Sequence, residues 1–220
     1  LSVGAQVVLV NAATFDGHWA HEFDPRHTDD EPFRTAGGQD VQVKMMHLSG
    51  ADLPCTNRDQ ESGIAAVELP YLGGQYAMLL ILPPEDQNVY DFAKRLSPDA
   101  LHRLLGKLTD EEVELGLPRF EMFDSHDIMD YLASKGLKNI DLGAISPQLT
   151  PSDALDQVVQ KTWIETDEEG TRAAVASGSS DVGSSTTQMP IIFNRPFIFI
   201  VRHESTGAIL FFGIVQNPLG

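Results

Sequence analysis

The stretch GTRAAVASGSSDVGSSTTQ, residues 170–188, is the most informative part of this sequence. Small and polar residues dominate it, as in a flexible linker between domains. The short remainder of the chain, however, carries two apolar, strand-like segments, 191–201 and 208–215. A two-stranded hairpin cannot bury its own apolar faces, so these strands must complete a core that begins upstream. We therefore expect a long exposed loop inside one domain, residues 169–190, where functional segments and proteolytic cuts are common.

The start of this loop has the pattern of a strand. One face, at a period of two, holds only small or β-branched, uncharged residues: Thr171, Ala173, Val175, Ser177 and Ser179. Such a face could enter a sheet without burying a charge. Arg172 would lie on the opposite face, in water.

The rest of the chain mixes strand and helix patterns. Alternating or clustered apolar residues predict strands at 6–15, 41–48, 63–71, 75–82, 112–117 and 154–166. Helical spacing between caps and breakers predicts helices at 88–96, 99–108 and 124–135. The segment 27–38 is polar and rich in turn residues. A mixed α/β (α+β) fold is therefore expected.

The composition argues against several classes of partner, against an intrachain disulfide and against a membrane span. The formal net charge of −17 argues against nucleic acid, heparin-like polyanions and anionic membranes. Cys55 is the only cysteine, so no intrachain disulfide is possible, and a buried, inert thiol is the expected role. The most apolar stretches, 77–82 and 191–201, are too short or too interrupted to span a bilayer.

Motifs for other functions are weak. The segment GSSDVGSS (178–185) has the glycine spacing of a P-loop, but Ser184 replaces the lysine that would meet phosphates. Near-neighbours His18, His21 and Glu22 lack a partner cluster, so no metal site is expected. No Gly-x-Ser-x-Gly nucleophile motif occurs. We therefore expect no enzyme activity, no metal and no cofactor.

Several segments resemble the serpin family, in family order and over almost the whole chain. GTRAAVAS (170–177), after WIETDEE (163–169), resembles the hinge of inhibitory serpins. FNRPFIFIV (193–201) and TGAILFFGIVQNP (206–218) resemble the C-terminal strands of the family. Further matches are LVNAATFDGHW (9–19), similar to the strand where loop insertion begins, and VELPYLGGQYAMLLILP (67–83), similar to the central hairpin.

This resemblance implies a large mainly β sheet, a second sheet and helices, with residues 1–220 forming the C-terminal portion of a single serpin domain. The N-terminal helices of the family have no counterpart here. The resemblance also implies a suicide mechanism: a serine protease attacks the loop and forms an acyl-enzyme. The cut loop then inserts as a new strand and distorts the protease.

The resemblance also assigns roles to individual residues. The hinge would comprise Glu168, Gly170, Thr171, Ala173, Ala174, Val175 and Ala176. Asn11 and Trp19 would belong to the region where the sheet opens, with Gln160 on the neighbouring strand where the family usually has a histidine. An amide at this position can form hydrogen bonds but cannot titrate.

The reactive bond can be counted in two ways. From the hinge it falls at Ser184–Ser185, and back from Phe193 it falls at Ser185–Thr186. Either way the target protease meets Val182, Gly183 and Ser184, with no Arg or Lys. An elastase-like serine protease with a small pocket therefore fits better than a trypsin-like one.

Two alternatives stay within the family. The protein could be a non-inhibitory serpin with a carrier, chaperone or storage role, although the hinge of such serpins typically departs from small residues. It could also inhibit a cysteine protease. We expect secretion to the extracellular space, with an intracellular location as the alternative.

Overall fold

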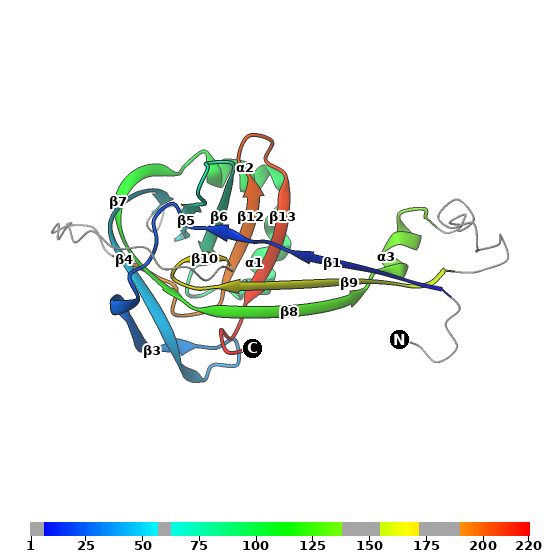
Figure 1. Cartoon of the computed structure of the whole chain (residues 1–220), viewed down its shortest axis with the longest axis horizontal. Helices are drawn as coiled ribbons and strands as arrows, with labels where there is room; N and C mark the ends of the chain where they lie inside the picture. The colour runs from blue at the N-terminus through cyan, green and yellow to red at the C-terminus, as the bar shows by residue number, and fades with distance from the viewer. Residues whose placement is uncertain (1–6, 57–62, 138–154, 172–189) are drawn as a thin grey trace. The chain divides into compact units, whose positions relative to one another are not determined.

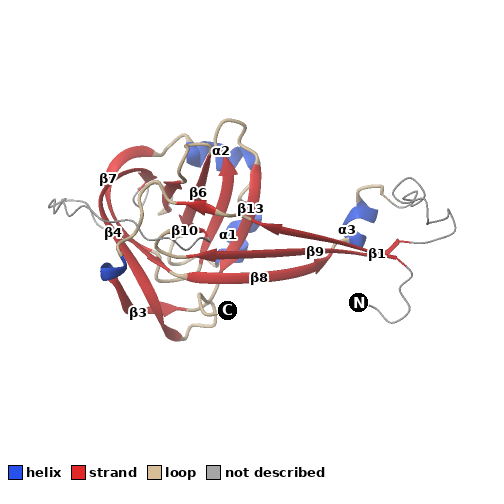
Figure 2. Cartoon of the chain, viewed as in Figure 1, coloured by secondary structure: helices blue, strands red, loops and turns tan. Residues whose placement is uncertain are grey.

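A computed structural model describes residues 7–56, 63–137, 155–171 and 190–220 (Figure 1). The chain divides into two compact units. The smaller contains Leu1–Phe15 and Met122–Ile164, and the larger contains Asp16–Glu121 and Glu165–Gly220. Strands predominate among the described residues, with three α-helices and one 3-10 turn, η1 (Pro25–His27) (Figure 2). The expected mixed α+β fold is confirmed.

The larger unit is built on an eight-stranded sheet of order β11-β7-β4-β5-β6-β12-β13, with β3 added beside β4. Its pairs are antiparallel except for β11 with β7. The strands are β3 (Thr28–Arg34), β4 (Asp40–Thr56), β5 (Ala65–Pro70), β6 (Tyr76–Leu82), β7 (Thr109–Pro118), β11 (Ile191–Ile192), β12 (Phe197–His203) and β13 (Ile209–Val215).

The hairpin of β5 and β6 lies at the centre of this sheet. Both strands are almost entirely buried, which explains their near-continuous apolar sequence. Gly73 and Gly74 close the hairpin with φ values of 91° and 61°, a left-handed conformation that favours glycine. The backbone N–H of Tyr71 donates to the carbonyl oxygen of Tyr76 across the turn.

Helices α1 (Val89–Arg95) and α2 (Pro98–Leu105) cover part of this sheet. Each begins at a side-chain cap, Asn88 for α1 and Ser97 for α2. Their apolar faces pack on residues of β5, β6 and β12 in one cluster that includes Phe92, Leu104, Leu79, Ile81, Ile198 and Ile200. Burial of such side chains is the main stabilising contribution to the larger unit.

The smaller unit contains a three-stranded sheet of order β1-β9-β8. Strand β1 (Val7–Thr14) runs parallel to β9 (Leu155–Thr166), and β8 (Phe120–Asp127) leads toward α3 (Met129–Ser134). The last residues of β9 and the first of β8 belong to the larger unit. Three large apolar side chains of this sheet are exposed: Leu9, Val10 and Phe123.

Two expectations about elements are wrong. The segment 27–38 contains strand β3, which pairs with β4 from Thr28 to Arg34 and buries Phe33 completely. The helix expected at 124–135 is only α3, because β8 continues to Asp127. Both errors arise where polar residues occupy a strand at the edge of its sheet.

Two smaller expectations can be compared directly with the described residues. Cys55 is buried, and burial together with nearby Glu111 and Asp110 raises the pKa of its thiol to about 11. The thiol is therefore protonated at neutral pH and inert, as expected. In the part of the chain that the structure describes, no helix has the length and apolar character of a membrane span.

Candidate functional site

A tight turn joins β9 to β10 (Gly170–Thr171) at the start of the expected loop. The backbone N–H of Asp167 donates to the carbonyl oxygen of Gly170 at 3.0 Å. The Asp167 carboxylate accepts the backbone N–H groups of Glu169 and Gly170 at 3.0 and 3.2 Å. Short acidic side chains favour such turns because they bond the backbone two or three residues ahead. Local sequence therefore accounts for the chain reversal.

Strand β10 pairs antiparallel with β2 (Gly17–His18). Gly170 lies opposite His18, and Thr171 lies opposite Gly17. The backbones approach so closely that a Cβ atom at position 170 would lie 2.1 Å from the carbonyl oxygen of Gly17. Any side chain at 170 would therefore force the two strands apart.

An aromatic pair, Trp19 and Tyr71, packs beside this two-stranded sheet. Their rings stack with centroids 4.6 Å apart and planes 16° apart. Trp19 donates from its ring Nε1 to the carbonyl oxygen of Asp167 and from its backbone N–H to that of Glu169, both at 3.0 Å. The Tyr71 hydroxyl lies 2.7 Å from Thr171 Oγ1. We call residues 17–19, Tyr71 and residues 167–171 the hinge site.

Glu168 connects the hinge site to two further side chains. Its Oε1 accepts hydrogen bonds from Arg119 Nε and Nη2 at 2.9 and 2.6 Å, and from the Thr28 hydroxyl. Glu168 is only 5% exposed. Burial by itself raises the pKa of this carboxyl, but the bonds from Arg119 and Thr28 outweigh it and the net pKa is lowered. Glu168 is therefore ionised at neutral pH and holds Arg119 beside the turn.

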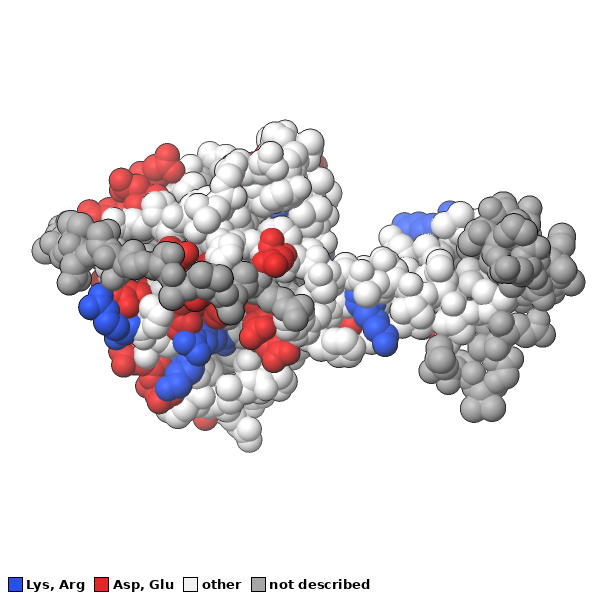
Figure 3. Space-filling view, viewed as in Figure 1, with Lys and Arg blue, Asp and Glu red and all other residues white. Residues whose placement is uncertain are grey.

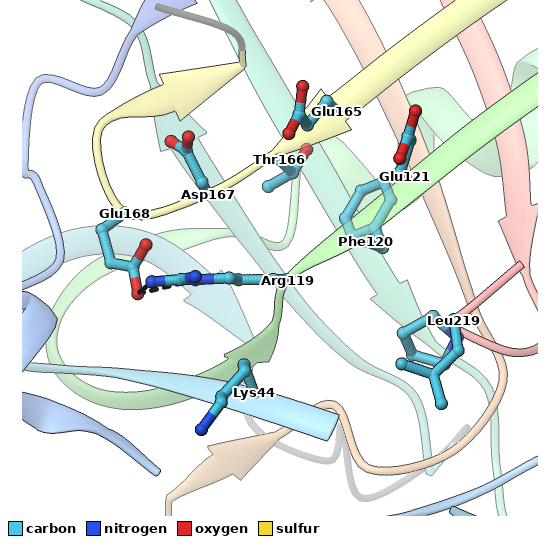
Figure 4. A pocket seen from close by; sticks show the side chains of 10 residues that line it. Lys44, Arg119, Phe120, Glu121, Glu165, Thr166, Asp167, Glu168 and Leu219 are labelled. Carbon is cyan, nitrogen blue, oxygen red and sulfur yellow. Dashed lines mark hydrogen bonds and ion pairs between the residues drawn. The ribbon is translucent and has the colours of Figure 1, made fainter. Parts of the chain in front are cut away.

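A pocket of about 340 Å³ opens beside this cluster, and Figure 4 shows its lining side chains with the Arg119–Glu168 pair. Cations, carboxylates and apolar groups all contribute to it: Lys44, Arg119, Phe120, Glu121, Glu165, Thr166, Asp167, Glu168, Pro218 and Leu219. Within the described ranges, no group of three His, Cys, Asp or Glu side chains is placed to hold a metal ion.

The smaller unit holds two of the three residues expected where the sheet opens, since Trp19 lies in the larger unit. Asn11 on β1 lies directly opposite Gln160 on β9, and both are exposed. The parallel pairing between β1 and β9 runs from Val7 to Thr14. A new strand entering between them would have to break this ladder of backbone hydrogen bonds.

The structure brings four expected site residues together and leaves others elsewhere. Glu168, Gly170, Thr171 and Trp19 meet in the hinge site. Asn11 and Gln160 belong to the other unit. The remaining expected residues lie outside the described ranges: Ala173, Ala174, Val175, Ala176, Ser184, Ser185 and Thr186.

The expected start of the exposed loop is wrong. Gly170 is buried and Thr171 is 0% exposed, since both are already strand residues. Neither Gly170 nor Thr171 therefore belongs to an exposed loop. Thr171 is held by the Tyr71 hydroxyl and by its pairing with Gly17.

Sequence reasoning missed three residues of this region: Tyr71, Arg119 and Thr28. Each reaches the hinge segment from a distant part of the chain, 100, 49 and 140 residues away along the sequence. Only Tyr71 carried a signal, since it lies between the apolar strand β5 and the Gly73-Gly74 turn.

Comparisons with known proteins agree with this architecture. The family model described as Serpin (serine protease inhibitor) matches residues 1–218. Human Serpin B11 is 32% identical over 96% of this chain and 55% of its own length. Leukocyte elastase inhibitor of Xenopus laevis is 31% identical over 97% of this chain and 58% of its own length. The chain thus spans little more than half of these relatives.

Solved structures with a similar fold support the same family relationship. Thyroxine-binding globulin in complex with thyroxine has a TM-score of 0.80, 27% identity, and coverage of 100% of this chain and 59% of its own. Native protease nexin-1 with heparin has a TM-score of 0.77, 28% identity, and coverage of 98% and 57%.

The second structure corrects one expectation. The net charge of −17 argues against heparin-like polyanions, but protease nexin-1, which has a similar fold, was solved with heparin, so this expectation is not borne out. Net charge does not describe a local surface: on the larger unit, Lys and Arg side chains lie among the acidic ones (Figure 3). The relatives come from the A, B and I groups of serpins, so they do not favour one cellular location over another. On the family match and these relatives, the chain belongs to the serpin family.

Proposed function

We propose that the full-length protein containing this chain is a suicide inhibitor of a serine protease and not an enzyme. The observation that carries the proposal is the hinge site, where small, uncharged Gly170 and Thr171 already pair as a strand. A hinge that is sterically and electrostatically compatible with a sheet supports insertion of the loop that follows it. Residues 1–220 would be the C-terminal portion of the single serpin domain.

The proposed target is an elastase-like protease with a small pocket, cut at Ser184–Ser185 or Ser185–Thr186. Small residues before both bonds support this choice. A relative named leukocyte elastase inhibitor is consistent with it. We further propose a secreted protein, with an intracellular location as the alternative, to be decided by immunoblotting of medium and cell extract.

A carrier role is the second candidate. The structural match to thyroxine-binding globulin, at a TM-score of 0.80, is the observation that favours it. A carrier would bind a small apolar ligand without forming a covalent complex with any protease. A cysteine-protease target is a third possibility within the same mechanism.

The test incubates the full-length protein with elastase-like, chymotrypsin-like and trypsin-like serine proteases and with a papain-like cysteine protease. Denaturing electrophoresis should show an adduct with the elastase-like enzyme and none when its catalytic serine is replaced by alanine. Mass spectrometry of the released C-terminal peptide locates the cut. Complete cleavage without any adduct across the panel would contradict inhibition and favour the carrier role.

A further inference from the structure

The Tyr71 hydroxyl occupies a rigid position beside the hinge. Its ring stacks on Trp19, and the two residues form an isolated antiparallel bridge. Its backbone N–H is bonded to Tyr76, and the next residue, Leu72, is bonded to the carbonyl oxygen of His18. Tyr71 is only 2% exposed. Backbone and ring together therefore leave the hydroxyl little freedom to follow a moving partner.

The Tyr71 hydroxyl forms a hydrogen bond with a side chain of the hinge segment. Thr171 Oγ1 lies 2.7 Å away, in a buried contact between residues 100 positions apart. Burial raises the pKa of the Tyr71 phenol, so the group stays protonated and can donate to the threonine. A buried hydroxyl whose partner is removed is strongly disfavoured, whereas removal of both partners can be almost neutral.

The backbone of Thr171 is held at the same time. Strand β10 pairs antiparallel with β2, which is how a strand joins a sheet. Trp19 fixes the turn before it through the carbonyl oxygens of Asp167 and Glu169. The side-chain hydrogen bond and the backbone pairing thus hold the same register, with Thr171 opposite Gly17.

We propose that Tyr71 is a positioning residue for inhibition: its hydroxyl holds Thr171 in strand register so that insertion continues from this point. This inference rests on the proposed inhibitory function. The hydroxyl acts by keeping the hinge docked before the protease cuts the loop. The contact therefore promotes insertion and does not have to break before insertion begins.

The experiment compares Tyr71→Phe with the parent in the full-length protein. The variant leaves Thr171 Oγ1 buried without this donor. Insertion of the loop should therefore become slower relative to hydrolysis of the acyl-enzyme. We expect the ratio of inhibition to substrate turnover to fall about tenfold, with the rate of loop cleavage unchanged. Thr171→Ser, which keeps a hydroxyl, should behave as the parent. Tyr131→Phe, at an exposed tyrosine of α3, serves as the control.

A double variant separates positioning from general destabilisation. Thr171→Val alone should resemble Tyr71→Phe, while the combination of the two should recover most of the inhibition, because both partners of this hydrogen bond are then removed together. A double variant as poor as Tyr71→Phe would overturn the proposal. So would a Tyr71→Phe protein that inhibits more efficiently than the parent, which would make the hydroxyl a latch.

Hydrogen exchange keeps the inference independent of the proposed function. In the uncleaved protein, Tyr71→Phe should speed exchange of the backbone amides of Gly170 and Thr171 about tenfold, and the double variant should reverse this. If exchange responds in this way but the parent inhibits no protease of the panel, the inhibitory function fails while the docking role of Tyr71 stands. Unchanged exchange at these amides would overturn the docking role itself.

Discussion

At the scale of single residues, the hinge site depends on groups chosen for size and for hydrogen bonding. Gly170 is required by space, because a side chain there would meet the carbonyl oxygen of Gly17. Glu168 is required by charge, because it is buried and satisfied by Arg119 and Thr28. Both residues tolerate few substitutions, and both lie next to the loop that is proposed to move. Substitutions here should affect stability and inhibition together.

The ion pair of Arg119 with Glu168 allows a test with a defined pH dependence. Arg119→Ala should lower the free energy of unfolding of the full-length protein by about 1–3 kcal/mol at pH 7, because a buried carboxylate loses its charged donor. The folded-state pKa of Glu168 lies below its ordinary value of 4.5, so the stabilisation is present above pH 4.5 and is lost as pH falls through the folded pKa.

Urea unfolding of parent and variant at pH 7 and in steps below pH 4.5 measures this difference. Arg34→Ala is the matched control, since Arg34 and Asp40 form an ion pair whose side chains are 70% and 56% exposed. That variant should change stability little at any pH. A difference for Arg119→Ala that stays constant down to acid pH would show that Glu168 is not the group involved.

At the scale of elements, much of the strand and helix order could be predicted and the contacts between elements could not. Strands β1, β5 and β6 follow from apolar patterns, and α1 and α2 follow from their caps. Strand β3 was missed because its sequence, TDDEPFR, is mostly polar and only Phe33 is fully buried. Patterns report burial, so a strand that is largely exposed gives little signal.

In the candidate site, too, some residues could be predicted from the sequence, whereas their contacts could not. Gly170 and Thr171 could be predicted because local composition and family resemblance both mark them. Their burial could not, since it depends on Tyr71 and Trp19, which approach from other parts of the chain. Likewise nothing local pairs Arg119 with Glu168. Tertiary contacts of this kind are the part of a fold that a sequence pattern does not contain.

A more deeply buried ion pair joins β5 to β12, and its removal should destabilise the sheet of the larger unit. Arg202 donates to both oxygens of Glu68 at 2.7 Å, and their side chains are 14% and 8% exposed. Arg202→Ala should destabilise the full-length protein by about 3–5 kcal/mol, because it leaves a buried carboxylate unpaired.

Replacing both partners with apolar residues provides the contrast. The double variant Glu68→Leu, Arg202→Leu should recover most of that loss, since no charge then remains buried. Chemical unfolding of the parent, the single variant and the double variant measures the three free energies. Equal losses in the single and double variants would mean that packing, and not the unpaired charge, dominates.

At the scale of the whole molecule, several large apolar side chains on strands are exposed among the described residues. Those on the sheet of the smaller unit and on β13 are Leu9, Val10, Phe123, Ile209, Leu210 and Phe212. The chain also covers only 52–61% of its curated relatives. Exposed apolar strands tend to associate with one another.

We therefore expect the 220-residue chain, when produced alone, to self-associate. Size-exclusion chromatography with light scattering should show species larger than the 24.1 kDa monomer. Replacing Leu9, Val10 and Phe123 with serine should reduce this association, whereas serine at three exposed polar positions should not. A monomeric chain that unfolds in one cooperative transition would contradict the expectation.

The central claim is that cleavage of the loop allows it to join a sheet as a new strand. An inserted strand adds backbone hydrogen bonds and buried apolar surface, so the cut protein should be more stable than the intact one, which is then a kinetic trap. The most direct measurement is the Tm of the full-length protein before and after cleavage by a protease at the loop, with the fragments kept together. We predict a large rise in Tm on cleavage. An unchanged or lower Tm after complete cleavage would contradict the claim and leave a serpin fold that does not inhibit by insertion.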